Sequence, residues 1–184
     1  MVLKGKVMVD LYEDFLTDAD VKDIGEYVHS KIGTFVWRPS FAWGDINKGS
    51  SNCNSLPMHP DILMYVYKKF KKLYPDLVTL ENFRCNFHSW NHFSLLRTHN
   101  DGTYHLGATI YLNREEWNVD WGGLFYYLEK DEIKIIKPKY KRAVVTKSGI
   151  EHGVTTLNYF APIRCTLQIF VLLLKLFCQL ETIP

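Results

Sequence analysis

From Glu81 onward the sequence is a succession of short β-like segments separated by turns, and this succession limits the chain to a β-rich core. Many of the segments are rich in β-branched and aromatic residues, which favour strands. The segments read NFRCNFHSW, FSLLRTH, YHLGATIYLN, GGLFYYL, EIKIIKP, RAVVTKSG, IEHGVTTL and RCTLQIFVLLL. About eight strands with regularly spaced turns predict a double-sheet jelly roll.

The region before this core predicts one strand and two helices. KVMVDL alternates like a strand, and LTDADVKDIGEYVHSKIG has the period of a helix. Thr17 and Asp20 are spaced as a capping box at the start of that helix. A second helix with an apolar face is expected from Pro60 onward. The predicted class is therefore α+β, mainly β, with a core at 81–175 and N-terminal support at 1–80.

We expect residues 1–184 to form a single domain, since a chain of this length can bury one sizeable core. The segment 39–56 is rich in Gly, Asn and Ser and predicts a long loop, of a kind that often has a function. Trp43 and the loop glycines suggest a mobile cover over the mouth of the barrel.

Composition argues against several classes of protein. The formal net charge of +2 does not favour a nucleic-acid partner, and the short basic cluster at 137–142 is typical of a solvated hairpin. The four cysteines are far apart and form no CxxC pair. The N-terminus has charges where a signal peptide needs an apolar core, and LQIFVLLLKLF is too short to span a bilayer. These features predict a soluble cytoplasmic protein with no membrane partner.

The sequence RTHNDG places His99 and Asp101 two residues apart, followed by a glycine. On an extended segment such residues point to the same side. Asn-Asp-Gly is also ordinary turn chemistry, which is the alternative interpretation. A further histidine, His152, lies on a later β-like segment. Two histidines and one carboxylate are the ligand set of the facial triad that binds Fe(II) and leaves positions open.

Arg164 offers a cation for the far carboxylate of a bound 2-oxo dicarboxylate. It lies near the start of the last apolar segment, where an unpaired buried charge is costly. Arginine binds carboxylates through two parallel hydrogen bonds. Thr166, two residues later, faces the same side and adds a hydroxyl donor. The alternative is an arginine at the exposed edge of a strand.

Six segments follow one another between about Asn82 and Leu173: RTHND, ATIYLN, WGGLFYYL, IKPKYKRAVV, EHGVT and RCTLQIF. They comprise an HxD strand, a YLN strand, a Gly-Gly turn, a proline-containing hairpin, a histidine, and an arginine before threonine. In this order they resemble the Fe(II)- and 2-oxoglutarate-dependent oxygenases of the prolyl-4-hydroxylase-like superfamily. The resemblance covers roughly half of the chain.

The resemblance implies a double-stranded β-helix, a cupin-like jelly roll, with iron on His99, Asp101 and His152. It implies a dioxygenase that uses Fe(II), 2-oxoglutarate and dioxygen to hydroxylate a C–H bond, with ascorbate as a reductant. Succinate and carbon dioxide would be released.

The same resemblance implies contacts to 2-oxoglutarate. Arg164 would pair with its far carboxylate, and Tyr111 would donate a hydrogen bond to the same group. Thr109 would face the same cavity, and Phe125 would pack against the cosubstrate.

The chain also departs from the family pattern. A tyrosine and a Gly-rich turn often precede the first ligand, whereas here the stretch reads CNFHSWNHFSLLR. By strand alternation, Asn86, His88 and Trp90 are candidates for the pocket wall that this part of the family pattern forms. The remaining histidines considered, His59, His92 and His105, are expected at the surface or behind the ligands.

Three functions remain open from the sequence. The first is a hydroxylase of a prolyl or other residue in a peptide or protein, and the second is a hydroxylase of a free amino acid or small metabolite. The third is a non-catalytic cupin-like binding module. A nucleic-acid demethylase is disfavoured, because those enzymes usually carry a second arginine where this chain has Phe170. The sequence leaves the exact substrate and the oligomeric state undetermined.

Overall fold

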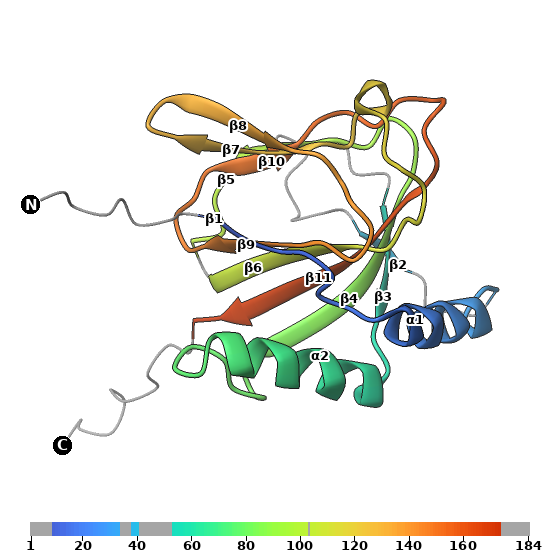
Figure 1. Cartoon of the computed structure of the whole chain (residues 1–184), viewed down its shortest axis with the longest axis vertical. Coiled ribbons are helices and arrows are strands. Elements are labelled where there is room, and N and C mark those ends of the chain that lie inside the picture. The colour runs from blue at the N-terminus through green and yellow to red at the C-terminus, as the bar shows by residue number, and fades with distance from the viewer. Residues whose placement is uncertain (1–8, 34–37, 41–52, 103, 174–184) are drawn as a thin grey trace, which may run out of the picture.

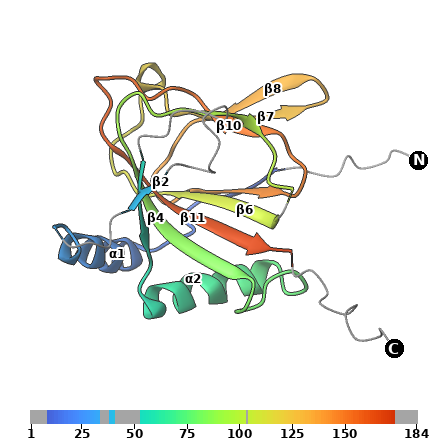
Figure 2. The same ribbon diagram turned by 180° about the vertical axis from the view of Figure 1, so that it is seen from behind.

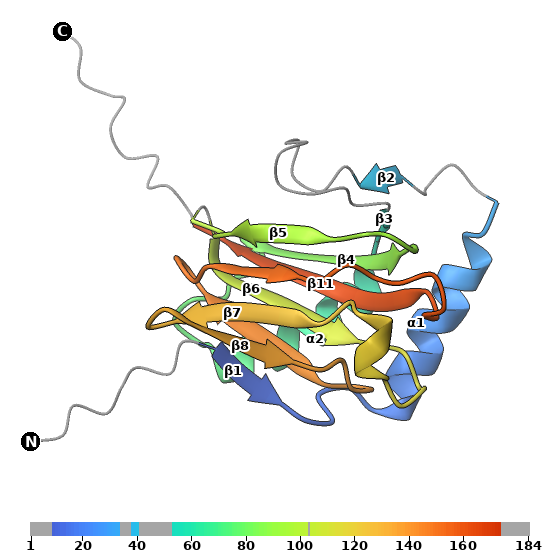
Figure 3. The same ribbon diagram turned by 90° about the horizontal axis from the view of Figure 1, so that it is seen from above.

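The structure is a computed structural model that describes residues 9–33, 38–40, 53–102 and 104–173. Within these ranges the strands form two antiparallel sheets that face each other (Figure 1). The major sheet has seven strands in the order β1-β9-β6-β11-β4-β3-β2, and the minor sheet has four in the order β5-β10-β7-β8. Figure 3 shows the minor sheet lying over the major one. The chain is thus mainly β, with a jelly-roll-like core.

All eight β-like segments of the sequence contain a strand. In the major sheet these strands are β4 (Phe83–Trp90), β6 (Tyr104–Tyr111), β9 (Ala143–Lys147) and β11 (Arg164–Leu172). In the minor sheet they are β5 (Leu96–His99), β7 (Phe125–Glu129), β8 (Glu132–Ile136) and β10 (His152–Val154). The predicted N-terminal strand is present as β1 (Val9–Tyr12), and a short 3-10 helix, η3 (Val119–Trp121), precedes β7.

Two helices lie against the outer face of the major sheet (Figures 1 and 2). Helix α1 (Asp18–Ser30) begins with a capping box between Thr17 and Asp20, and α2 (Pro60–Leu73) has proline in its first turn. Apolar side chains of both helices, such as Phe70, pack into one core with the helix-facing residues of the sheet. None of the described helices is long and apolar enough to cross a membrane.

Strand alternation divides β11 between two environments. Leu167, Ile169 and Val171 belong to the core shared with the helices. Residues of opposite parity, including Arg164 and Gln168, face the minor sheet, since successive strand side chains point to opposite faces. The space between the two sheets therefore receives the polar side chains of this strand.

The expectation of an uninterrupted loop over 39–56 is wrong at both of its ends. β2 (Arg38–Ser40) pairs with β3 (Cys53–Pro57), and β3 pairs with β4. The polar composition of 53–57 hid this strand, because backbone pairing with β4 compensates for low intrinsic strand propensity. Trp43, and with it the proposed cover, lies outside the described residues.

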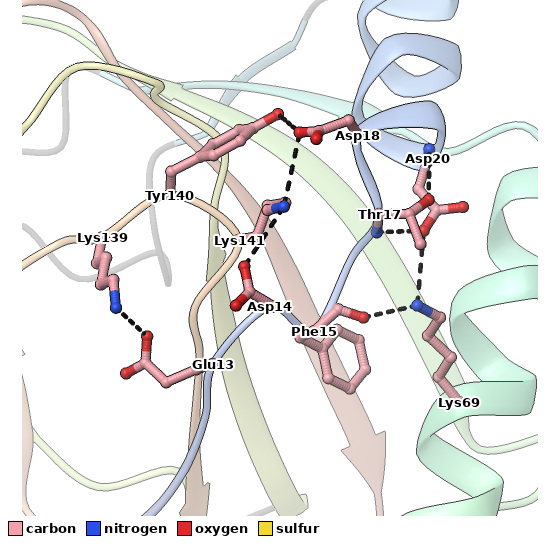
Figure 4. A network of polar contacts seen from close by, with 10 residues as sticks. All are labelled: Glu13, Asp14, Phe15, Thr17, Asp18, Asp20, Lys69, Lys139, Tyr140 and Lys141. Carbon is pink, nitrogen blue, oxygen red and sulfur yellow. Dashed lines mark hydrogen bonds and ion pairs between the residues drawn. The ribbon is translucent and has the colours of Figure 1, made fainter.

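The basic cluster before β9 is paired with acidic residues of the chain itself (Figure 4). Lys139 lies 2.9 Å from Glu13, and Lys141 lies 3.4 Å from Asp14 and 3.6 Å from Asp18. Each exposed pair contributes little alone. Together they connect the segment between β1 and α1 to the loop between β8 and β9.

Candidate active site

His99 and His152 are brought together by strand pairing in the minor sheet. β5 and β10 pair with His99 directly opposite His152, and their ring centroids are 4.5 Å apart. Asp101 follows β5, with one carboxylate oxygen 3.7 Å from His99 Nε2 and the other 3.6 Å from His152 Nε2. One potential ligand atom from each of the three residues lies within 4.8 Å of the others. The three predicted ligands thus converge on one point.

Backbone carbonyls set the tautomers of both histidines. Nδ1 of His99 lies 2.8 Å from the carbonyl oxygen of Arg97, and Nδ1 of His152 lies 2.9 Å from that of Ile150. A carbonyl only accepts, so each Nδ1 carries a proton, and in the neutral tautomer with this proton Nε2 has the free lone pair. Burial also lowers the pKa of His152, which favours the neutral ring. Both rings are therefore prepared to bind a metal through Nε2.

Gly107 leaves the room that the Asp101 carboxylate occupies. A Cβ at this position would lie 3.0 Å from Asp101 Oδ2 and 3.2 Å from Thr146 Oγ1. Sequence reasoning did not identify this residue, although a glycine inside a strand often marks a close approach.

A β-bulge in β5 lies next to the candidate ligands. His152 pairs with His99 and Val154 with Leu96, so that two residues of β5 oppose Gly153. A Cβ on Gly153 would lie 2.4 Å from Tyr126 Oη and 2.5 Å from the carbonyl oxygen of Leu96. Only glycine therefore lets β10 pass beneath the Tyr126 side chain at this point.

The three residues line one pocket between the sheets. Its wall includes Trp90, Thr109, Phe125, Gln168 and Phe170. Of the predicted cosubstrate contacts, Thr109 and Phe125 line this cavity, and Phe125 stacks on His152 at 5.5 Å between ring centroids. Sequence reasoning missed Gln168 and Phe170, although they follow Arg164 at even spacing and so face the same side.

Arg164 is buried next to the Trp90 wall, with 1% of its surface exposed. Its guanidinium carbon lies 5.3 Å from the Trp90 ring centroid and 5.2 Å from that of Tyr111. Among the described residues, none accepts a hydrogen bond from its three side-chain nitrogens. The rings attract the cation, yet a buried guanidinium without an anion is costly. An anion supplied by a ligand would satisfy this guanidinium.

Tyr111 and Thr166 lie beside Arg164, and within the described part of the chain none of the three is among the residues that line the pocket. Tyr111 Oη is buried and also has no hydrogen-bond partner among the described residues. Burial raises the pKa of Tyr111 while the charge of Arg164 opposes that rise, so the hydroxyl keeps its proton as a donor. Thr166 is fully buried and is paired with Tyr111 across β11 and β6.

The other histidines lie apart from the three converging residues. His59 is the N-cap of α2, and His92 Nε2 contacts the Ala161 carbonyl oxygen at 2.8 Å. His105 is at the start of β6. None of the three belongs to the group of potential metal ligands within the described part of the chain.

His88 is buried on the same face of β4 as Trp90, and its pKa is lowered to about 4 by burial and by the charge of Arg164. An unfolded chain takes up this proton near its ordinary pKa of about 6.5. Between these values only the unfolded state is protonated, so stability falls as the pH falls. Lowering the pH from about 7 to about 4.5 should reduce the free energy of unfolding of both proteins. We expect this reduction to be about 2 kcal/mol smaller in His88→Gln than in the parent.

Urea unfolding of both proteins at the two pH values measures this difference. Carboxylates contribute equally to the two proteins and cancel in the comparison. Equal losses would show that His88 takes up a proton in the folded state as readily as in the unfolded one.

The chain is similar in fold to several solved structures. No protein-family model and no curated protein sequence matches the chain significantly. A prolyl-4-hydroxylase from Pseudomonas putida matches with a TM-score of 0.68 and 18% identity, over 89% of this chain and 91% of that chain. A prolyl hydroxylase from Trichoplax adhaerens, in complex with a hypoxia inducible factor peptide, matches with a TM-score of 0.72 and 14% identity, over 89% and 83%.

The viral collagen prolyl hydroxylase of Paramecium bursaria Chlorella virus-1, in a 2-oxoglutarate complex, matches with a TM-score of 0.67 and 15% identity, over 92% and 98%. At these identities the likeness concerns the fold. The chain has the fold of prolyl-hydroxylase-like 2-oxoglutarate Fe(II) oxygenases.

Proposed function

We propose that this chain is an Fe(II)- and 2-oxoglutarate-dependent dioxygenase that hydroxylates a C–H bond of a prolyl or other residue in a peptide or protein. One observation carries the proposal. His99, Asp101 and His152 converge on one cavity, and Arg164 lies buried beside the Trp90 wall of that cavity with no anion among the described residues.

The donor set fits Fe(II). Two neutral imidazoles and one carboxylate are the ligands of non-haem Fe(II) oxygenase sites, and they leave coordination positions open for a cosubstrate and dioxygen. The backbone contacts of His99 and His152 leave both Nε2 atoms available. Gly107, which has no side chain, leaves room for the Asp101 carboxylate beside the two histidines. These three residues would hold the metal.

The buried Arg164, which has no anion among the described residues, supports a dicarboxylate as the cosubstrate. Arg164 would pair with the far carboxylate of 2-oxoglutarate, and Tyr111 would donate a hydrogen bond to it. Fe(II), 2-oxoglutarate and dioxygen supply the oxidising chemistry when bound, and succinate and carbon dioxide leave. Ascorbate, as the reductant that maintains Fe(II), belongs to the same proposal. The protein residues bind, orient and shield the reacting groups.

A peptide substrate is supported over a free amino acid by the structures of similar fold. The Trichoplax adhaerens protein is seen with a peptide, and the viral protein is a collagen prolyl hydroxylase. Both share the two-sheet architecture over most of this chain.

Succinate release measured against pools of proline-containing peptides and of free amino acids tests the proposal. We expect succinate to be released in step with hydroxylation of peptides, and both to be absent from Asp101→Ala. Hydroxylation confined to free amino acids would overturn the peptide assignment. Binding of a ligand without any 2-oxoglutarate-dependent turnover would favour the non-catalytic module.

A further inference from the structure

Three buried polar side chains on β6 and β11 form a hydrogen-bond chain in which each side chain donates to the next. Thr109 Oγ1 donates to Gln168 Oε1 at 3.1 Å, and Gln168 Nε2 donates to Thr166 Oγ1 at 3.5 Å. The exposed fractions of Thr109, Gln168 and Thr166 are 8%, 8% and 0%. Buried polar groups that are satisfied by one another hold a defined orientation.

The hydrogen-bond chain runs from the candidate metal site toward Arg164. Gln168 is paired with Thr109 across the two strands, and both line the cavity that contains His99, Asp101 and His152. Thr166 is paired with Tyr111 and lies two residues from Arg164 on the same face of β11. The last member of the chain therefore lies beside the two buried donor groups that have no partner among the described residues.

The donors and acceptors of a primary amide explain the direction. Its oxygen only accepts and its nitrogen only donates. Because Gln168 Oε1 takes the Thr109 hydrogen, Gln168 Nε2 faces Thr166 and occupies a lone pair of that hydroxyl. Thr166 accepts this bond, and its own hydroxyl hydrogen remains for another acceptor.

We propose that Gln168 is a positioning residue for the cosubstrate. By donating to Thr166 it directs the Thr166 hydroxyl hydrogen toward the far carboxylate of 2-oxoglutarate, as a third donor beside Arg164 and Tyr111. The inference rests on the function proposed above and adds a residue that acts through another.

Two substitutions at Gln168 separate its effect on the orientation of the Thr166 hydroxyl from the effect of its size. Gln168→Met has a similar length and no polar atoms, so Thr166 loses its fixed orientation. In Gln168→Glu both threonines donate to the carboxylate, so that the Thr166 hydrogen turns away from the cosubstrate. Asn86→Asp is the charge control, because Asn86 is paired with Gln168 on β4.

The experiment is calorimetric binding of 2-oxoglutarate to the full chain, anaerobically, with Mn(II) in place of Fe(II). The comparison ligand is 2-oxovalerate, which has the same chain length and a methyl group in place of the far carboxylate. We expect Gln168→Met to weaken 2-oxoglutarate roughly fivefold, which is about 1 kcal/mol, and to leave 2-oxovalerate within about twofold. Binding of Mn(II) itself should also stay within about twofold of the parent.

A double-mutant cycle shows whether Gln168 acts through Thr166. In a Thr166→Val background, Gln168→Met should change 2-oxoglutarate binding by less than about twofold. Gln168→Glu should weaken binding more than Asn86→Asp does. Full additivity in the cycle, or equal losses for the two acidic variants, would overturn the inference.

The outcomes distinguish this inference from the proposed function. If the parent does not prefer 2-oxoglutarate over 2-oxovalerate, the proposed cosubstrate site fails and the inference fails with it. If the parent shows that preference and Gln168→Met binds as the parent does, only the role of Gln168 is wrong. Thermal unfolding of each variant verifies that the binding data come from folded protein.

Discussion

Arg164→Ala is expected to raise the 2-oxoglutarate concentration needed for half-maximal turnover by roughly 30-fold to several-thousand-fold. Arg164 is almost fully buried, and its guanidinium finds no anion among the described residues. Removing one partner of a buried charge pair costs on the order of 2–5 kcal/mol, at about 1.4 kcal/mol per factor of ten. Initial rates of succinate release over a range of 2-oxoglutarate concentrations measure the change.

Related variants and a second ligand control for this result. Arg164→Lys should have a milder effect, because lysine keeps the charge and loses the planar fork. Tyr111→Phe should weaken 2-oxoglutarate by about 1.5–3 kcal/mol, the range for a hydrogen bond to a charged group. Pyruvate lacks the far carboxylate, so Arg164→Ala should lose most of the discrimination against it. A variant that keeps the parental preference would exclude Arg164 from the carboxylate site.

Alanine at His99, Asp101 or His152 is expected to weaken Fe(II) binding by more than about 100-fold and to abolish measurable hydroxylation. Loss of a group that only supports a ligand typically costs about 10–100-fold in affinity, and loss of the ligand itself should cost more. Anaerobic titration of each variant with Fe(II) measures the affinity independently of turnover.

His92→Ala is the matched control for the histidine variants. Its imidazole contacts the Ala161 carbonyl oxygen and is not part of the converging group, so metal affinity should be unchanged. If His99→Ala bound Fe(II) as tightly as His92→Ala does, His99 would not be a ligand.

The sequence predicts the strands well because their signals are local. β-branched and aromatic segments separated by turns locate all eight core strands, and the spacing of Thr17 and Asp20 locates the start of α1. His99 ends β5 and Asp101 follows it two residues later, so the closeness of these two side chains is local in the sequence. That His152 joins them depends on the pairing of β10 with β5, which no local pattern contains.

The residues that the sequence analysis missed depend on contacts between distant segments. β3 is a strand because β4 supplies its backbone partners, although its own residues favour turns. Gly107 matters because the Asp101 carboxylate packs against it. Gln168 interrupts an apolar run, yet its proposed role depends on Thr109, which strand register places opposite it. Such facts follow from strand register, which one-dimensional patterns specify weakly.

The most direct test of the central claim is anaerobic visible absorption of the parent protein with Fe(II) and 2-oxoglutarate. Both components together should produce the weak charge-transfer band of a 2-oxo acid chelated to Fe(II), saturating near one iron per chain, while either component alone should not. The band should be absent from Asp101→Ala, whose ligand set is incomplete. Folded parent protein that shows no band at saturating Fe(II) and 2-oxoglutarate would contradict the account.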